Sequence, residues 1–569
     1  MGKFAELYTE EGLKMPKIPW DVYPRPMMKR DSFLCLNGEW DFSIKYGKEE
    51  CIFEKITVPF SPETLLSGIE ADIPEENYDS MVYRKSFSID EGFDRGRILL
   101  HFGAVSNYAE ITFNGKTVGI HRGAYDSFSF DVTSLVKKDN VIEVYAKNIL
   151  NDKLLPYGKQ SRKRGGMWYT PTSGIWQTVW LESVPLEYIK NIETYTDSNR
   201  VTVKAEGIDK GRVQVYTDNG TIEYEMNGGE CVFEIESPRL WSPDDPYLYN
   251  FSVETETDRV ESYFAFRTVE IKEKDGYKRI LLNGKPIFFH GLLDQGYWSD
   301  GGMTPPSPES YAYDIEKMKS LGFNMLRKHI KIEPQQFYYD CDRLGMIVFQ
   351  DMVNNGSYSF IRDTALPTVG WQNRSDKRMH RDNSTREMFV EGMEKTVKAL
   401  KNHPCICCWT IFNEGWGQFC GTEMYGRLKA LDDSRIIDTA SGWFSKVESD
   451  VESKHVYFRK AKLKAGKKPL VLSEFGGYSY RVEGHIFNPD REYGYGKYKN
   501  RDEFARAFCE LYKNEIIPLA KKGLCASVYT QVSDVEDETN GLLTFDRRVM
   551  KVTPEEFLPI SEELKNCIE

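Results

Sequence analysis

The chain has no long apolar run. No stretch of its 569 residues approaches the roughly 18 apolar residues that a membrane-spanning helix needs. The first six residues, Met-Gly-Lys-Phe-Ala-Glu, also lack the apolar segment of a secretory signal. We therefore expect a cytoplasmic protein with no membrane partner.

Positive charge is also scarce. The 75 Lys and Arg are outnumbered by 87 Asp and Glu, which gives a formal net charge of −12. Nucleic acids and anionic membranes select basic surfaces, because their phosphates attract Lys and Arg. The composition therefore argues against a nucleic-acid partner.

The spacing of metal-binding residues is missing as well. The chain has 11 cysteines and 8 histidines, and three of the cysteines crowd together at Cys405, Cys407 and Cys408. Structural zinc sites pair such cysteines with a second Cys or His pair downstream, and no such pair follows at that spacing. We expect free, buried thiols and no metal or other cofactor.

What the chain does contain is enough apolar and aromatic residues, 40% and 13%, for two to four packed domains. Residues 1–185 read as short alternating strands separated by turns, with a hairpin at Asn114-Gly115. This pattern predicts a jelly-roll β-sandwich. Three tryptophans at 168–180 close it, either as a sugar platform or, more commonly, as packing between domains.

Residues 186–272 continue in β-structure with about seven short strands, which is the size of an immunoglobulin-like sandwich. Because the Cys-Trp-Cys pattern of a true immunoglobulin domain is absent, only the architecture is predicted.

Residues 273–569 then alternate strands and helices, and one helix carries Phe389, Met393, Val397 and Leu400 on one face. Eight such strands predict a (β/α)8 barrel.

Two of these barrel strands end in glutamate. Residues 405–412 lead into Asn413-Glu414, and residues 469–473 lead into Glu474. Parallel barrels present reactive groups where their strands end. Acetal hydrolysis needs a carboxylic acid to protonate the leaving oxygen and a carboxylate to attack the sugar or activate water. We expect Glu414 as the acid, Glu474 as the nucleophile and Asn413 on the sugar 2-hydroxyl. The alternative is two ordinary solvated glutamates.

The chain resembles glycoside hydrolase family 2, the family of β-galactosidases, β-glucuronidases and β-mannosidases. The resemblance spans nearly the whole chain and is most specific at the two strand ends. It implies a retaining mechanism, with Tyr457 beside the nucleophile and Arg327 supporting it. The matching motifs are Leu36-Asn-Gly-Glu-Trp40, Gly174-Ile-Trp-Gln177, residues 240–249, Leu282-Asn-Gly-Lys-Pro286, Cys341-Asp-Arg-Leu-Gly345, Asn413-Glu414, His455-Val-Tyr457 and residues 469–475.

Departures from the family pattern bear on the sugar. The magnesium ligands of large β-galactosidases have no counterparts around residues 354–358, so no metal is expected. The lysine of the glucuronidase Asn-x-Lys motif is missing from Thr539-Asn-Gly-Leu542, and the mannosidase Trp-Gly-Gly run is absent. An exo-acting β-galactosidase-like enzyme is favoured, with a uronidase or a mannosidase as alternatives. A non-catalytic carbohydrate-binding protein is the alternative of another class.

A basic group, Lys328, His329 and Lys331, follows Arg327. Because strand residues alternate, Arg327 and His329 should share one side and Lys328 the other. The group either holds an acidic substrate or packs against a neighbouring loop. Further candidates for contacts with sugar hydroxyls and ring faces are Asp294, Trp298, Trp416 and Trp443. The expected partner is a carbohydrate, and sandwich domains of this size often mediate homodimers.

Overall fold

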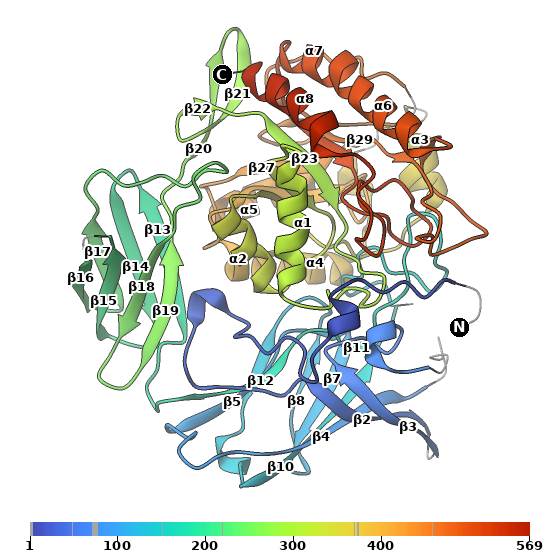
Figure 1. Cartoon of the computed structure of the whole chain (residues 1–569). Helices are drawn as coiled ribbons and strands as arrows, with labels where there is room; N and C mark the ends of the chain where they lie inside the picture. The colour runs from blue at the N-terminus through green and yellow to red at the C-terminus, as the bar shows by residue number, and fades with distance from the viewer. Residues whose placement is uncertain are drawn as a thin grey trace.

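The computed structural model describes residues 4–47, 49–70, 78–150, 152–218, 220–368, 370–372, 375–457 and 459–568. Figure 1 shows three bodies: a blue sandwich from the N-terminal part, a green sandwich beside it, and a barrel from the yellow and red parts of the chain. This is the predicted multidomain fold. None of the helices formed by these residues combines the length and apolar character needed to cross a membrane.

The first body is a sandwich of antiparallel sheets. In strand β10, Ile142, Val144 and Ala146 are buried while the residues between them are partly exposed, which is the alternation of a strand with one core face. Asn114 and Gly115 both have positive φ (50° and 76°), so they form the predicted two-residue turn between β7 and β8. The strands are β1 (Phe33–Cys35), β2 (Gly38–Tyr46), β3 (Glu49–Val58), β4 (Ser80–Ser88), β5 (Arg97–Phe102), β6 (Val105–Ser106), β7 (Tyr108–Phe113), β8 (Lys116–Arg122), β9 (Phe128–Asp131), β10 (Asp139–Lys147), β11 (Gly174–Ile175) and β12 (Val179–Val184). They form sheets in the orders β3-β2-β4-β10-β7-β8, β1-β12-β5-β9 and β11-β6.

The second body is the immunoglobulin-like sandwich. Its strands are antiparallel neighbours in the order β13-β14-β17-β16-β15-β18-β19. Val201 and Val203 of one strand pack with Phe251 and Val253 of another in a core of their own. The strands are β13 (Asn191–Asp197), β14 (Arg200–Glu206), β15 (Lys210–Thr217), β16 (Gly220–Asn227), β17 (Glu230–Glu234), β18 (Tyr249–Glu254) and β19 (Arg259–Phe264).

A small antiparallel sheet of three strands leads into eight parallel strands. The three are β20 (Val269–Lys274), β21 (Tyr277–Leu282) and β22 (Lys285–Pro286). Their order is β27-β26-β25-β24-β23-β32-β29-β28. The two ends of this order meet through Ser441 Oγ of β27, which lies 3.3 Å from Ser453 Oγ and 3.0 Å from His455 Nε2 of β28. The strands are β23 (Phe289–Asp294), β24 (Met325–Lys328), β25 (Ile347–Asp351), β26 (Ile406–Asn413), β27 (Ile436–Ser441), β28 (Glu452–Val456), β29 (Leu470–Gly476) and β32 (Leu524–Thr530).

Helices cover the outside of this barrel. Helix α4 buries Phe389, Met393, Val397 and Leu400, which is the predicted face. Within the described chain, the connections from β27 to β28 and from β28 to β29 contain no helix, so the barrel departs from the ideal alternation there. The remaining elements are α1 (Glu309–Ser320), α2 (Gln335–Leu344), α3 (Leu366–Thr368), α4 (Asn383–Leu400), α5 (Gly421–Leu431), β30 (Tyr478–Ser479), β31 (Tyr495–Lys497), α6 (Arg501–Leu511), α7 (Ile517–Ala520) and α8 (Pro554–Asn566).

A loop of the first sandwich reaches the barrel where the barrel strands end. Arg164 binds Glu536 and Asp537 at 2.6 Å each, and the Tyr169 hydroxyl donates to Glu538 Oε1 at 2.8 Å. These contacts fix the jelly roll against one side of the barrel mouth. The division into 1–185, 186–272 and 273–569 stays a prediction, and its second boundary falls within strand β20.

Candidate active site

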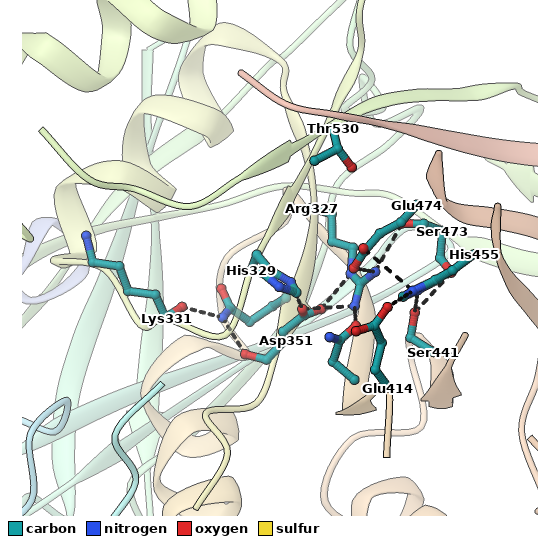
Figure 2. A network of polar contacts seen from close by, with 12 residues as sticks. Arg327, His329, Lys331, Asp351, Glu414, Ser441, His455, Ser473, Glu474 and Thr530 are labelled. Atoms are coloured by element: carbon teal, nitrogen blue, oxygen red, sulfur yellow. Dashed lines mark hydrogen bonds and ion pairs between the residues drawn. The ribbon is translucent and has the colours of Figure 1, made fainter. Parts of the chain in front are cut away.

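The ends of four barrel strands converge on one point. Asn413 is the last residue of β26 and Asp351 the last of β25. Glu474 lies near the end of β29, and Arg327 lies in β24. Glu414 follows with a left-handed backbone (φ 50°), which turns the chain sharply at the strand end. Figure 2 shows the side chains of Arg327, Asp351, Glu414 and Glu474 gathered around one point. The sequence placed Glu414 and Glu474 at strand tips, and the structure brings the two together.

Arg327 is the centre of this group and is 1% exposed. Its guanidinium binds Asp351 through two bonds of 3.0 Å, Glu474 Oε1 at 3.1 Å and Asn413 Oδ1 at 2.9 Å. A guanidinium presents its donors in a rigid plane, so it fixes the relative positions of all three partners. Arg327 therefore holds the Glu474 carboxylate and orients Asn413.

His329 shares this side of the strand, as the alternation predicts. Its Nδ1 lies 2.9 Å from Asp351 Oδ2. Burial lowers the pKa of His329 to about 4, so the ring is neutral at neutral pH. The neutral ring therefore carries its proton on Nδ1, and this N–H donates a hydrogen bond to the Asp351 carboxylate.

Glu474 is held in its ionised form. Burial opposes ionisation, but the neighbouring His455 and Arg327, together with a hydrogen bond donated by the Tyr457 hydroxyl, outweigh burial and lower the pKa of Glu474 well below its usual value. His455 also lies 2.9 Å from Glu414 Oε1 through its Nδ1. One carboxylate oxygen of Glu414, one of Glu474 and the His455 nitrogen all lie within 4.8 Å of one another.

His455 is a site residue that the strand-end pattern alone does not predict. It belongs to the quoted His455-Val-Tyr457 motif, and alternation along the chain puts both side chains on one side. Behind it, Ser441 Oγ contacts His455 Nε2 at 3.0 Å and donates to Ser473 Oγ at 3.0 Å. This chain of hydrogen bonds fixes the ring between the two glutamates (Figure 2).

An aromatic cluster lies beside Glu414. Trp416 stacks on Trp168 of the first sandwich at 5.4 Å, and Tyr358 packs edge-on against both rings. Trp416 is 2% exposed, so its faces are occupied by protein. Trp443 is half-buried in the connection after β27. The cluster joins the jelly roll to the barrel next to the site.

Trp298 lies in packed surroundings instead. It is 3% exposed, belongs to the barrel core with Tyr311, and has Arg547 over its ring at 4.0 Å. A ring covered in this way offers no free face to a sugar. The contacts favour packing over the predicted sugar contact.

Lys328 and Lys331 also have internal partners. Lys328 binds Asp294 at 2.6 Å and Glu333 at 2.9 Å. Lys331 donates to Glu333 and Met303 O at 2.8 Å each and also to Gly296 O, so its three protons are used. Figure 2 shows the Lys331 side chain pointing away from the glutamate pair. These bonds support the packing alternative for both lysines and for Asp294.

A parallel barrel with a carboxylate pair where its strands end, preceded by two β-sandwiches, carries the two acidic groups that acetal hydrolysis requires. Residues 269–550 match "Glycosyl hydrolases family 2, TIM barrel domain". Residues 191–267 match "Glycosyl hydrolases family 2", and residues 60–169 match "Glycosyl hydrolase 2 galactose-binding domain-like". The chain belongs to glycoside hydrolase family 2.

Relatives carry two activities in their names. The chain is 27% identical over 396 residues to a β-galactosidase of Thermoanaerobacter pseudethanolicus, covering 64% of this chain and 49% of that protein. It is 26% identical over 417 residues to a β-glucuronidase of Bacteroides fragilis, covering 67% and 56%. The chain thus spans about half the length of the curated relatives it matches.

Solved structures share the fold over the whole chain. A β-D-glucuronidase for Dictyoglomus thermophilum has a TM-score of 0.73 at 21% identity, covering 95% of this chain and 98% of that one. A β-galacturonidase from Eisenbergiella tayi, solved with galacturonate, has a TM-score of 0.68 at 19% identity, covering 96% and 99%. At these identities the likeness concerns the fold.

Proposed function

We propose that the protein is an exo-acting, retaining β-glycosidase that works by double displacement. Glu474 attacks the anomeric carbon while Glu414 protonates the leaving oxygen. Glu414 then takes a proton from water, which attacks the same carbon and releases the sugar from Glu474 with its original configuration. Asn413 binds the 2-hydroxyl.

The observation that carries this proposal is the separation of the two carboxylates. Retaining enzymes hold their pair roughly 5 Å apart, whereas inverting enzymes leave about 6.5–9.5 Å for a water molecule. Oxygens of Glu414 and Glu474 lie within 4.8 Å of each other, which supports direct attack by one of them. The lowered pKa of Glu474 supports its role as the nucleophile.

The substrate is a terminal β-linked sugar. The loop that carries Arg164 and Tyr169 closes one side of the barrel mouth, which favours a pocket that accepts a chain end over an open cleft. The sequence favours a β-galactoside, and the names of the relatives add β-glucuronides. Assay of nitrophenyl β-galactoside, β-glucuronide and β-mannoside tests the proposal, and cleavage of any of them excludes a purely sugar-binding protein.

Tyr457→Phe should move the acid limb of kcat/KM to higher pH. The Tyr457 hydroxyl donates a hydrogen bond to Glu474, so its loss raises the pKa of that carboxyl. Because Glu474 must be ionised to attack, the variant loses activity at a higher pH than the wild type as the pH is lowered. A hydrogen bond to a charged group is worth about 1.5–3 kcal/mol, which corresponds to roughly 1–2 pH units. The check is a pH profile of both proteins.

The control for this profile is Thr530→Val, which removes the other partner of the Tyr457 hydroxyl, at 2.9 Å, and leaves Glu474 untouched. It should shift the limb far less. Identical acid limbs in the wild type and Tyr457→Phe would show that the hydroxyl does not stabilise the ionised nucleophile.

Activity should survive exhaustive chelation. Glu414, His455 and Glu474 could together hold a metal ion, but two of these ligands are the proposed acid and nucleophile. A cation there would occupy both carboxylates, so it would inhibit. Kinetics after dialysis against EDTA check this, and loss of activity that magnesium restores would contradict it.

A further inference from the structure

Lys159 is a buried cation supplied by the jelly-roll domain. It lies in the loop between β10 and β11, where its carbonyl accepts a 3.0 Å hydrogen bond from the Tyr169 backbone N–H. The residue is 7% exposed. Because Tyr169 is itself tied to Glu538 of the barrel, the backbone of Lys159 is fixed beside the barrel mouth.

The ammonium of Lys159 has no acceptor within the described part of the chain. Its Nζ lies 5.2 Å from the ring centre of Trp416 and 5.9 Å from that of Tyr169. By contrast, Arg327, Lys328 and Lys331 are matched by carboxylates or carbonyls. Because most of the Lys159 side chain is shielded from water, an anion that reached its ammonium would be held more strongly than at an open surface.

No carboxylate among the described residues forms a hydrogen bond or ion pair with Lys159. The charge of Lys159 acts on the Glu538 carboxylate. Both carboxyl oxygens of Glu538, however, already accept hydrogen bonds from Tyr169, Gln531 and Asn540. Burial raises the pKa of Glu538, and the charge of Lys159 opposes that shift.

Lys159 is also close to the proposed reaction centre. Trp416 follows Glu414 by two residues, and its backbone N–H donates to Asn413 O at 2.9 Å. The charge of Lys159 also acts on His329, which is bonded to Asp351 of the Arg327 network. A sugar seated between the two glutamates therefore lies next to this ammonium.

We propose that Lys159 is a specificity-determining residue that selects an acidic sugar: its ammonium binds the carboxylate of a β-linked hexuronic acid. This deepens the proposed function and rests on it. The carboxylate of the substrate would then pair with the ammonium of Lys159. It requires the jelly roll, so the pocket is complete only when the two domains are together.

Two pairs of substrates test this inference, because each pair differs only in CH2OH against COO⁻ at C6: nitrophenyl β-glucuronide with β-glucoside, and β-galacturonide with β-galactoside. The wild type should prefer the uronide in at least one pair. Lys159→Met should lower kcat/KM on that uronide about 10- to 100-fold and change the hexoside by less than about threefold. Lys159→Arg, which keeps the charge, should lose less, and Lys163→Met, at an exposed position of the same loop, should change neither value.

Equal rates on uronide and hexoside in the wild type, or equal losses on both in Lys159→Met, would overturn the inference. Calorimetric titration of the wild type and Lys159→Met with D-glucuronate, D-galacturonate and the neutral hexoses gives an answer independent of turnover. Weaker binding of the acids alone by the variant supports the inference, and unchanged binding contradicts it. Failure of the wild type to cleave any β-glycoside would instead contradict the proposed function.

Discussion

Replacement of Glu474 by alanine should lower kcat by about 10,000-fold or more on every glycoside that the protein cleaves, because no covalent intermediate can form. Arg327 and Tyr457 donate hydrogen bonds to this carboxylate and favour its ionised form. Neither of them can attack the sugar in its place. Steady-state kinetics measure the loss. Azide can enter the space that the side chain leaves and attack that face, and its product should be the inverted glycosyl azide.

Glu483→Ala is the control, since this glutamate is exposed in the segment that follows the same strand. It should retain wild-type activity. A Glu474→Ala variant with more than about one hundredth of wild-type kcat would contradict the nucleophile assignment, because a missing nucleophile costs far more than that.

Replacement of Glu414 by alanine should have an effect that depends on the leaving group. A dinitrophenolate departs without a proton, whereas an alkoxide or a sugar needs one in the transition state. The variant should keep most of the rate of glycosyl-enzyme formation on the dinitrophenyl glycoside and lose about 100- to 10,000-fold on unactivated glycosides. Pre-steady-state kinetics separate the two steps, and azide should give the retained glycosyl azide.

Glu423→Ala is a matched control, because this glutamate lies on α5 after the same strand with a largely exposed side chain. Equal losses on activated and unactivated substrates would show that Glu414 does not act as the acid. The acid would then have to be sought elsewhere around His455.

Much of the fold follows from local patterns. The turn at Asn114-Gly115, the apolar face of α4 and the eight barrel strands are each set by residues close together in the chain, and the structure confirms all of them. The described residues form no helix after β27 or β28, and the sequence holds no comparable signal for this. Loops and short strands differ too little in periodicity for the sequence to separate them.

The site could be predicted as far as strand ends determine it. Glu414, Glu474 and Arg327 converge because parallel strands of a barrel end on one face. The charged residues were harder to predict: Lys331 resembles a free cation in the sequence, and only the fold places carbonyl and carboxylate partners around it. Lys159 was missed for the opposite reason, because it reaches the site from another domain and no short-range pattern links it to the strand ends.

Trapping of the glycosyl-enzyme tests the central claim most directly. A 2-deoxy-2-fluoro-β-glycoside with a dinitrophenyl leaving group, made from the sugar that the protein cleaves best, forms a long-lived ester on a retaining nucleophile. Peptide mapping by mass spectrometry then locates the sugar. One adduct is expected, on the peptide that contains Glu474, and none with Glu474→Ala. An adduct on any other residue, or no adduct together with release of the inverted sugar from the natural substrate, would contradict it.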